Sequence, residues 1–345
     1  MRVDAGLVAM HLADVPARVR ELEALGYDGL FTFEGQTDPF LPLVLAAEHT
    51  SRAQLYTAVA IAFPRSPMTL AYTAHDLQVQ SSGRFALGLG AQIRTHVEKR
   101  YSAPYDHPAA RMREFVLALS AIWRCWNEGE RLDFRGRFYR HTLMTPIFVP
   151  ARSPWGPPPV WLAAVQPRMA EVAGEVADGL LVHPLNSRRF LDERLLPALD
   201  VGLARGGRTR AQCRLGCQVL AVTGATSAEV EQSATMIRQQ LAFYGSTPAY
   251  RPVLEVHGWG ALQEELHALS KQGRWVEMGD RISDEMLDTF AVRGLPEELP
   301  AQLVARYGGV ADRLSLMTYA GLELSARERW RAVVSAVRQI PGSVP

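Results

Sequence analysis

Residues 26–40 read GYDGLFTFEGQTDPF and contain a short apolar run that ends on a carboxylate. The run Leu30–Phe33 has the length and composition of a buried strand, and Glu34 follows it directly. Gly35 and several polar turn residues come next. A charged side chain at the end of an apolar strand needs a partner, water or a ligand, because a dry and unpaired carboxylate costs several kcal/mol.

The same order of strand and then helix recurs along the chain. Strands are expected at Val3–Met10, Gly29–Glu34, Leu55–Ala62, Phe85–Leu89, Val160–Ala164, Gly179–Val182, Arg214–Thr223 and Leu314–Tyr319. Amphipathic helices are expected at Val15–Leu25, Leu41–Thr50, Met68–Gln80, Arg111–Trp126, Arg168–Val176, Arg189–Leu203, Ala228–Phe243 and Pro300–Tyr307. Eight strands, each followed by or paired with a helix, predict an α/β fold of the (β/α)8 TIM-barrel type.

Two segments depart from this alternation. Glu130–Pro159 is rich in proline and aromatic residues and precedes the fifth strand. Gly245–Leu295 holds additional helical pieces and precedes the eighth strand. Neither has the composition of a flexible linker, so we expect one barrel domain over residues 1–345 with two insertions.

Composition limits the class of protein. Hydrophobic residues make up 48% and charged residues 21% of the 345 residues, which is typical of a globular domain. The net charge of +1 predicts no general attraction to nucleic acid or to an anionic membrane. No apolar run approaches the roughly 18 residues of a membrane span, and polar residues interrupt the N-terminal stretch where a signal peptide would be apolar.

The cysteines do not predict a disulfide framework. Cys213 and Cys217 lie four residues apart in an expected strand, which separates them by roughly 13 Å, beyond the reach of a disulfide. A reducing cytoplasm is the simplest location for such a protein.

Polar residues gather where the expected strands end. In a barrel of this kind the loops after the strands share one mouth, so these residues should converge. They are His11, Glu34, Thr57–Ala60, Gly90–Gln92, Val165–Gln166 and His183–Pro184. A single histidine or carboxylate in such a place is usually structural, whereas several on one rim indicate a site.

The stretch RFALGLGAQIRTHVEKRY, residues 84–101, contains the most informative of these strand ends. Gly88 and Gly90 lack the third glycine of a dinucleotide fingerprint, and they lie in the fourth βα unit. Glycines there let the backbone approach a flat or anionic ligand closely, although a simple tight turn also requires small residues. The sequence has no HExxH, CxxC, GxSxG or Walker motif, so no metal site, hydrolase elbow or phosphate loop is predicted.

These residues also carry a resemblance. SSGRFALGLGAQ resembles the S-x-GR-x-x-LG-x-G signature of the bacterial luciferase-like monooxygenase superfamily. The likeness continues through AYTAHDLQVQSSGR, PVWLAAVQPRMAEVAGEVADGLLVHPL and MGDRISDEMLDTFAVRGLPEEL, in order and over nearly the whole chain. The last segment and the helix after GLGAQIRTHVEKRYS are most similar to the branch that uses the deazaflavin coenzyme F420.

The resemblance implies a flavin-type ring in the barrel mouth and hydride transfer to or from a second substrate. It places a bulge with a non-prolyl cis peptide in the third strand, at Thr57 and Ala58. The residues implied in cofactor binding are Glu34, Thr57, Ala58, Ala60, Gly90, Ala91, Gln92, His96, Ala164, Val165, Gln166, Arg168, His183 and Pro184. Among them Gln92, Gln166 and Arg168 are expected near the anionic tail, together with Arg94.

Glu34 has two interpretations. Many members of the deazaflavin branch have an acid and then histidine at this position, but Gly35 stands here in place of the histidine. The catalytic histidine of the sugar-phosphate dehydrogenases therefore has no match in this sequence, which argues against a sugar phosphate as the substrate. Glu34 either faces the reactive ring, where it bonds the ring's polar edge or relays a proton, or it is held by a loop N–H or a rim arginine. His11 is the second candidate catalytic residue.

The favoured interpretation is an F420-dependent oxidoreductase that transfers a hydride between the deazaflavin and a small organic substrate. An FMN-dependent monooxygenase using O2 and a flavin-binding barrel without turnover are the alternatives. The resemblance also implies a homodimer formed by the helices beside the second and third strands, whose sequences FLPLVLAAEHT and MTLAYTAHDL are apolar.

Overall fold

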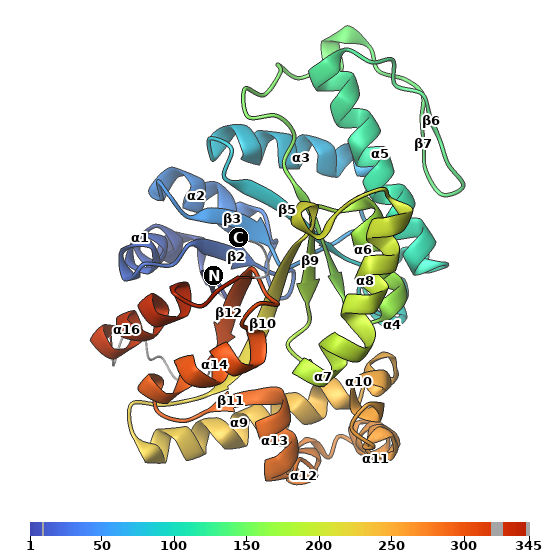
Figure 1. Cartoon of the computed structure of the whole chain (residues 1–345). Coiled ribbons are helices and arrows are strands. Elements are labelled where there is room, and N and C mark those ends of the chain that lie inside the picture. The colour runs from blue at the N-terminus through green and yellow to red at the C-terminus, as the bar shows by residue number, and fades with distance from the viewer. Residues whose placement is uncertain (9, 319–326, 343–345) are drawn as a thin grey trace.

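A closed parallel barrel wrapped by helices forms the centre of the protein (Figure 1). The computed structural model describes residues 1–8, 10–318 and 327–342. In this part of the chain the barrel order is β1-β2-β3-β5-β8-β9-β10-β12, and β12 pairs with β1 to close it. Closure leaves no open sheet edge. The predicted α/β barrel is confirmed.

The barrel strands are β1 (Arg2–Gly6), β2 (Gly29–Thr32), β3 (Gln54–Thr57), β5 (Phe85–Gly90), β8 (Val160–Ala164), β9 (Gly179–Val182), β10 (Arg214–Val222) and β12 (Arg313–Met317). Two short strands extend the sheet: β4 (Ala60–Ile61) pairs with β5, and β11 (Ala291–Arg293) pairs with β10. A separate antiparallel hairpin is formed by β6 (Phe134–Arg135) and β7 (Arg140–His141).

Helices follow the strands on the outside of the barrel. They are α1 (Val15–Leu25), α2 (Leu41–His49), α3 (Pro67–Gln80), α4 (Arg94–Lys99), α5 (Pro108–Glu128), α6 (Pro167–Val176), α7 (Arg188–Phe190), α8 (Leu196–Arg205), α9 (Ser227–Gly245), α10 (Arg251–Glu255), α11 (Gly260–Lys271), α12 (Trp275–Asp280), α13 (Asp284–Phe290), α14 (Leu299–Tyr307) and α16 (Arg327–Arg338). A π-helical turn over Leu191–Leu195 joins α7 to α8.

Some predicted boundaries differ from the structure. The first strand ends at Gly6, well before Met10, and the third is interrupted between β3 and β4. The eighth ends at Met317, and the predicted end at Tyr319 lies outside the described residues. Helix α16 was not predicted, although Trp330, Val333, Val334 and Val337 have the spacing of one buried helical face.

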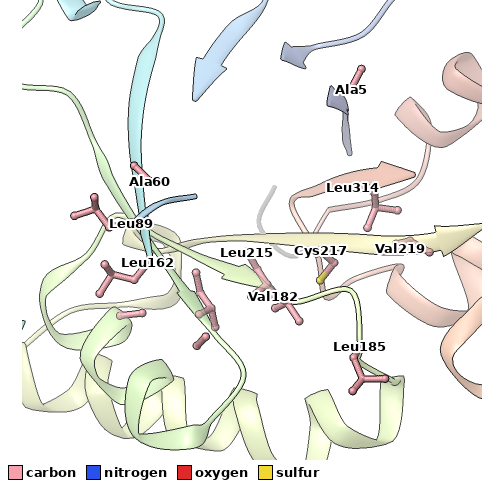
Figure 2. Close-up of a cluster of buried hydrophobic side chains, with 14 of the residues drawn as sticks. Ala5, Ala60, Leu89, Leu162, Val182, Leu185, Leu215, Cys217, Val219 and Leu314 are labelled. Carbon is pink, nitrogen blue, oxygen red and sulfur yellow. The ribbon is translucent and has the colours of Figure 1, made fainter. Parts of the chain in front are cut away.

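The main hydrophobic core surrounds the barrel. Figure 2 shows part of it, where Leu89, Leu162, Val182 and Leu215 from four neighbouring strands pack together. Helix α16 completes this layer beside α1, and the buried Trp330 Nε1–H donates to Tyr27 Oη at 2.6 Å. Burial of large apolar side chains supplies most of the free energy of folding in such a layer.

The inside of the barrel contains a charged pair. Arg313 donates to both carboxylate oxygens of Asp4, at 2.5 and 2.7 Å, and Tyr56 Oη donates to Asp4 at 2.8 Å. The Arg313 guanidinium also lies over the rings of Tyr56 and Trp161. Gly29 makes room for the pair, because a Cβ there would lie 2.4 Å from Asp4 Oδ1.

The two insertions lie on different sides of the barrel (Figure 1). The first, residues 130–159, runs along the outside of α5, where Glu114 accepts backbone N–H groups of Arg137, Phe138 and Tyr139. The second contains α10 to α13 and returns to the mouth of the barrel. There Ser187 Oγ, just after β9, lies 2.8 Å from His257 Nε2.

Candidate active site

A cavity of about 1920 Å³ opens at the carboxyl ends of the barrel strands. Asp4, Tyr56 and Arg313 form its floor, and the loops after the strands form its wall. Most of the residues predicted from the sequence line it: Glu34, Ala58, Gly90, Ala91, Gln92, His96, Ala164, Val165, Gln166, Arg168, His183 and Pro184. The structure therefore brings these residues to one place, as the barrel topology requires.

Three predicted residues do not line the cavity. His11 is exposed and precedes the short helical turn Leu12–Asp14, and its catalytic role stays a prediction. Thr57 is buried behind the wall, where its hydroxyl donates to Gly88 O and accepts from Gly88 N–H. Ala60 is buried in the core. Thr57 and Ala60 therefore support the wall without forming its surface.

The wall bulges where the third strand is interrupted. The peptide between Ala58 and Val59 is cis, one residue beyond the position that the resemblance implied. Ala58 N–H donates to Thr32 O, and Val59 O accepts from Glu34 N–H at 3.0 Å. The bulge therefore holds the end of β2 and places the backbone of residues 58 and 59 on the cavity surface.

Glu34 is held by three groups from two parts of the chain, namely β4 with the turn after it and the segment after α4. Its Oε2 accepts from Ile61 N–H at 2.7 Å and from Arg65 Nη1 at 2.6 Å, while its Oε1 accepts from Tyr101 Oη at 2.9 Å. Burial and the hydrogen bond to Glu34 raise the pKa of Tyr101. These are the contacts that the structural interpretation of Glu34 requires, yet the carboxylate also lines the cavity.

His183 projects from the end of β9 between two tyrosines. Its ring lies 4.6 Å from the Tyr244 ring and 4.7 Å from the Tyr250 ring. His183 Nδ1 accepts the Leu185 N–H at 3.1 Å, so the neutral imidazole carries its proton on Nε2. Burial lowers the pKa of His183 to about 3, although part of the residue is accessible from the cavity. It is therefore a neutral hydrogen-bond donor near pH 7.

Helix α9 and the start of the second insertion supply part of the wall. Gln240, Phe243 and Tyr244 line the cavity from α9, and residues 247–250 line it from the insertion. Gln166, at the end of β8, donates a hydrogen bond to Ala249 O and so ties this wall to the barrel. In contrast, no residue of the first insertion, all of which is described, lines the cavity.

The lining of the cavity is chemically mixed. His96, Arg94 and Arg168 come from the loops after β5 and β8. Arg94 is paired with Glu98 at 2.8 Å, whereas Arg168 is exposed in the first turn of α6 and has no hydrogen-bond or ion-pair partner among the described residues. Val8 and Phe33, after β1 and β2, and Phe243 on α9 add partly exposed apolar side chains.

Several lining or supporting residues were missed from the sequence. Arg65 lies in the turn after β4 and Tyr101 in the segment after α4, and nothing in the local sequence shows that they contact Glu34. Asp4 interrupts an apolar strand, which is the one sequence signal that the barrel floor is charged. Tyr244 and Tyr250 follow helical and turn patterns that carry no mark of a site.

The described residues show neither a metal cluster nor a membrane helix. No group of three or more His, Cys, Asp or Glu side chains in residues 1–8, 10–318 and 327–342 is placed to hold a metal ion. Among the same residues, no helix combines the length and apolar character needed to cross a bilayer.

Sequence comparisons identify related proteins. The chain is 53% identical over 309 residues to an uncharacterized protein of Mycobacterium tuberculosis, covering 90% of this chain and 91% of that one. It is 27% identical to the 5,10-methylenetetrahydromethanopterin reductase of Archaeoglobus fulgidus, with 74% of each chain covered. It is 31% identical to the F420-dependent glucose-6-phosphate dehydrogenase of Intrasporangium calvum, covering 54% of this chain and 59% of that one.

Solved structures share the fold. The coenzyme F420 dependent tetrahydromethanopterin reductase of Methanopyrus kandleri superposes with a TM-score of 0.77 at 18% identity, covering 99% of this chain and 98% of that one. An F420-dependent secondary alcohol dehydrogenase gives a TM-score of 0.73 at 14% identity, covering 98% and 99%. The family model for luciferase-like monooxygenases matches residues 1–313. The chain belongs to the luciferase-like monooxygenase family and is an oxidoreductase.

Proposed function

We propose that this protein is an F420-dependent oxidoreductase that transfers a hydride between the deazaflavin and a small organic substrate. The mixed lining of the cavity carries the proposal. Its arginines suit an anionic cofactor tail, and its apolar side chains suit an organic substrate. The names of the relatives support the choice of F420, because the glucose-6-phosphate and hydroxymycolic acid dehydrogenases among them are F420-dependent by name.

Arg168 is the residue best placed to bind an anionic tail. It is exposed on the cavity surface, and its side chain has no hydrogen-bond or ion-pair partner among the described residues. Pro167 has no N–H, and the Met169 and Ala170 N–H groups donate to Gln166 O, so the guanidinium is the group that α6 offers to an anion. Its planar set of N–H donors matches phosphate oxygens.

The remaining wall residues fit a flat ring. Ala58, Gly90 and Ala91 have small or absent side chains on the cavity surface, so a ring would contact backbone there. A bound deazaflavin supplies the hydride acceptor or donor. Glu34 would hold or pass a proton at its Oε1, through Tyr101, and His183 Nε2–H would donate to a polar atom of either ligand.

Cofactor preference is the decisive test. Fluorescence quenching of the purified protein by F420 and by FMN compares the two cofactors directly. We expect F420 to bind and FMN to bind at least about tenfold more weakly, which corresponds to about 1.4 kcal/mol. Tight FMN binding with none for F420 would support the monooxygenase alternative and refute the proposal. Cofactor binding without reaction across a screen of small alcohols and carbonyl compounds would favour a binding protein.

We also propose a homodimer that uses the surface of α2 and α3. Leu41 and Val44 on α2 and Val79 on α3 are exposed, and Ile147 and Phe148 of the first insertion are exposed as well. Tyr72 Oη on α3 donates to Phe148 O, so the insertion adjoins this surface. Sedimentation should show a dimer that Val44→Asp dissociates and Val201→Asp, on the exposed face of α8, does not. A monomer at micromolar concentration would contradict it.

We propose that the protein is cytoplasmic, because its cysteines form no disulfide. All three are free. Burial raises the pKa of the Cys213 thiol to about 11 and that of Cys217 to about 12, so both stay protonated and unreactive. Thiol titration of the protein in cell extract should return three reduced cysteines, and a disulfide would contradict this location.

A further inference from the structure

A strip of aromatic side chains leads from the cavity along α9 to α12. It begins at His183, whose ring contacts Tyr244, and continues to Phe243 at 5.9 Å and then to Trp275 at 6.3 Å, measured between ring centroids. His183 and Tyr244 line the main cavity, whereas Trp275 lies outside it on α12. The strip therefore connects the interior of the site with the surface.

The outer end of the strip is a groove of about 330 Å³ between α9 and α12. Its lining is mainly apolar: Met236, Gln239, Gln240, Phe243, Trp275, Val276 and Met278. Phe243 and Trp275 are each 52% exposed and Val276 is 69% exposed. Clustered exposed apolar side chains are unusual on a protein surface unless they serve binding.

The groove adjoins the main cavity. Gln240 and Phe243 line both, so a ligand that extends from the cavity across Phe243 reaches the groove. None of the residues that line the groove is charged, whereas Arg94 and Arg168 line the cavity at the loops after β5 and β8. The groove therefore suits a chain of methylene groups better than an anionic tail.

We propose that the groove between α9 and α12 is a subsite for the alkyl chain of an amphipathic substrate whose polar head lies in the cavity near His183. The proposal rests on the proposed function only in taking this cavity as the place where the head group binds. A substrate with a long apolar chain would bury Phe243, Trp275 and Val276. Each methylene buried should increase affinity about fourfold.

A series of straight-chain primary alcohols from 1-butanol to 1-decanol tests the subsite in the complete protein. Calorimetric titration should show affinity rising with chain length in the unmodified protein. In Trp275→Ala and Val276→Asp the binding of 1-decanol should fall about tenfold, since several buried methylenes lose their contacts, while 1-butanol binds as before. Val201→Asp on α8 is the matched control and should leave the series unchanged.

Three outcomes would overturn the subsite. One is the same chain-length dependence in the groove variants as in the unmodified protein. Another is a lack of binding by any of the alcohols. The third is a dimer that Val276→Asp dissociates, since the groove would then be covered by a second copy of this chain. Fluorescence quenching by F420, measured on the same proteins, tests cofactor binding separately from the subsite. If F420 did not bind, the proposed function would be refuted, but the dependence of alcohol binding on chain length would still stand.

Discussion

The cavity contains two carboxylate–arginine pairs that differ in how they are enclosed. On the floor, Asp4 and Arg313 are almost fully buried and come from adjacent barrel strands. On the wall, Glu34 and Arg65 come from loops, and Arg65 keeps 20% of its side chain exposed. Asp38 provides Arg65 with a second, longer contact at 3.7 Å.

This difference separates architecture from chemistry. Strand residues are fixed by the hydrogen-bonded sheet, so the floor pair cannot move without opening the barrel. Loop residues are fixed by a few contacts, so the wall pair can respond to a ligand. We expect changes on the floor to alter stability and changes on the wall to alter binding and turnover.

The largest expected effect is on the floor. Asp4→Ala leaves the Arg313 guanidinium buried without its counter-ion, and this should lower the free energy of unfolding by about 3–5 kcal/mol. Denaturant unfolding measures it. The double variant Asp4→Leu/Arg313→Met removes both charges and should recover much of the loss. Equal loss in the single and double variants would show that packing, and not charge, holds the floor.

The next effect is on the wall. Glu34→Gln keeps the shape of the side chain and removes its charge, so F420 should still bind while turnover falls by about 10²-fold or more, as expected for a lost acid or base. Deazaflavin absorbance follows turnover once a small substrate has been found. Asp38→Asn is the control, because it removes the other charge beside Arg65 and lies outside the cavity lining. If Glu34→Gln turned over at the rate of the unmodified protein at every pH, Glu34 would be a structural residue and not a catalytic one.

His183 should make stability depend on acid pH. The unfolded imidazole binds a proton below about pH 6.5, whereas burial keeps the folded imidazole neutral until about pH 3. The folded state is therefore destabilised as pH falls from about 6.5 towards 3. Between pH 7 and pH 5 the free energy of unfolding of the unmodified protein should fall by about 1–2 kcal/mol because of His183. The variant His183→Asn should not show this part of the decrease. Parallel pH curves for the two proteins would contradict this.

The smallest effect is expected at Arg168 on the wall. Arg168→Ala should weaken F420 binding about tenfold and reduce its sensitivity to salt, because one exposed charge contact is lost. Quenching titrations at several salt concentrations measure both. Arg194→Ala, an exposed arginine outside the cavity lining, should change neither. Unchanged affinity and salt dependence in Arg168→Ala would remove this residue from the cofactor site.

Much of the fold was predictable because its signals are local. The alternation of short apolar strands with amphipathic helices indicated the barrel, and barrel topology placed the strand ends at one mouth. Glu34, Gln92, Gln166 and His183 were found in this way and do line one cavity. Helix α16 was missed even though its apolar spacing is present in the sequence.

The sequence by itself determined the order of elements and which residues reach the mouth, since periodicity and turn residues act over a few positions. Only the tertiary structure decided the partners of those residues. Asp4 and Arg313 are 309 residues apart and meet because the barrel closes. Glu34 meets Tyr101, 67 residues away, because α4 folds over the mouth. Both insertions interrupt the alternation of strands and helices, yet the first covers α5 and part of the second lines the site. Such contacts depend on how distant surfaces pack together, which no local pattern encodes.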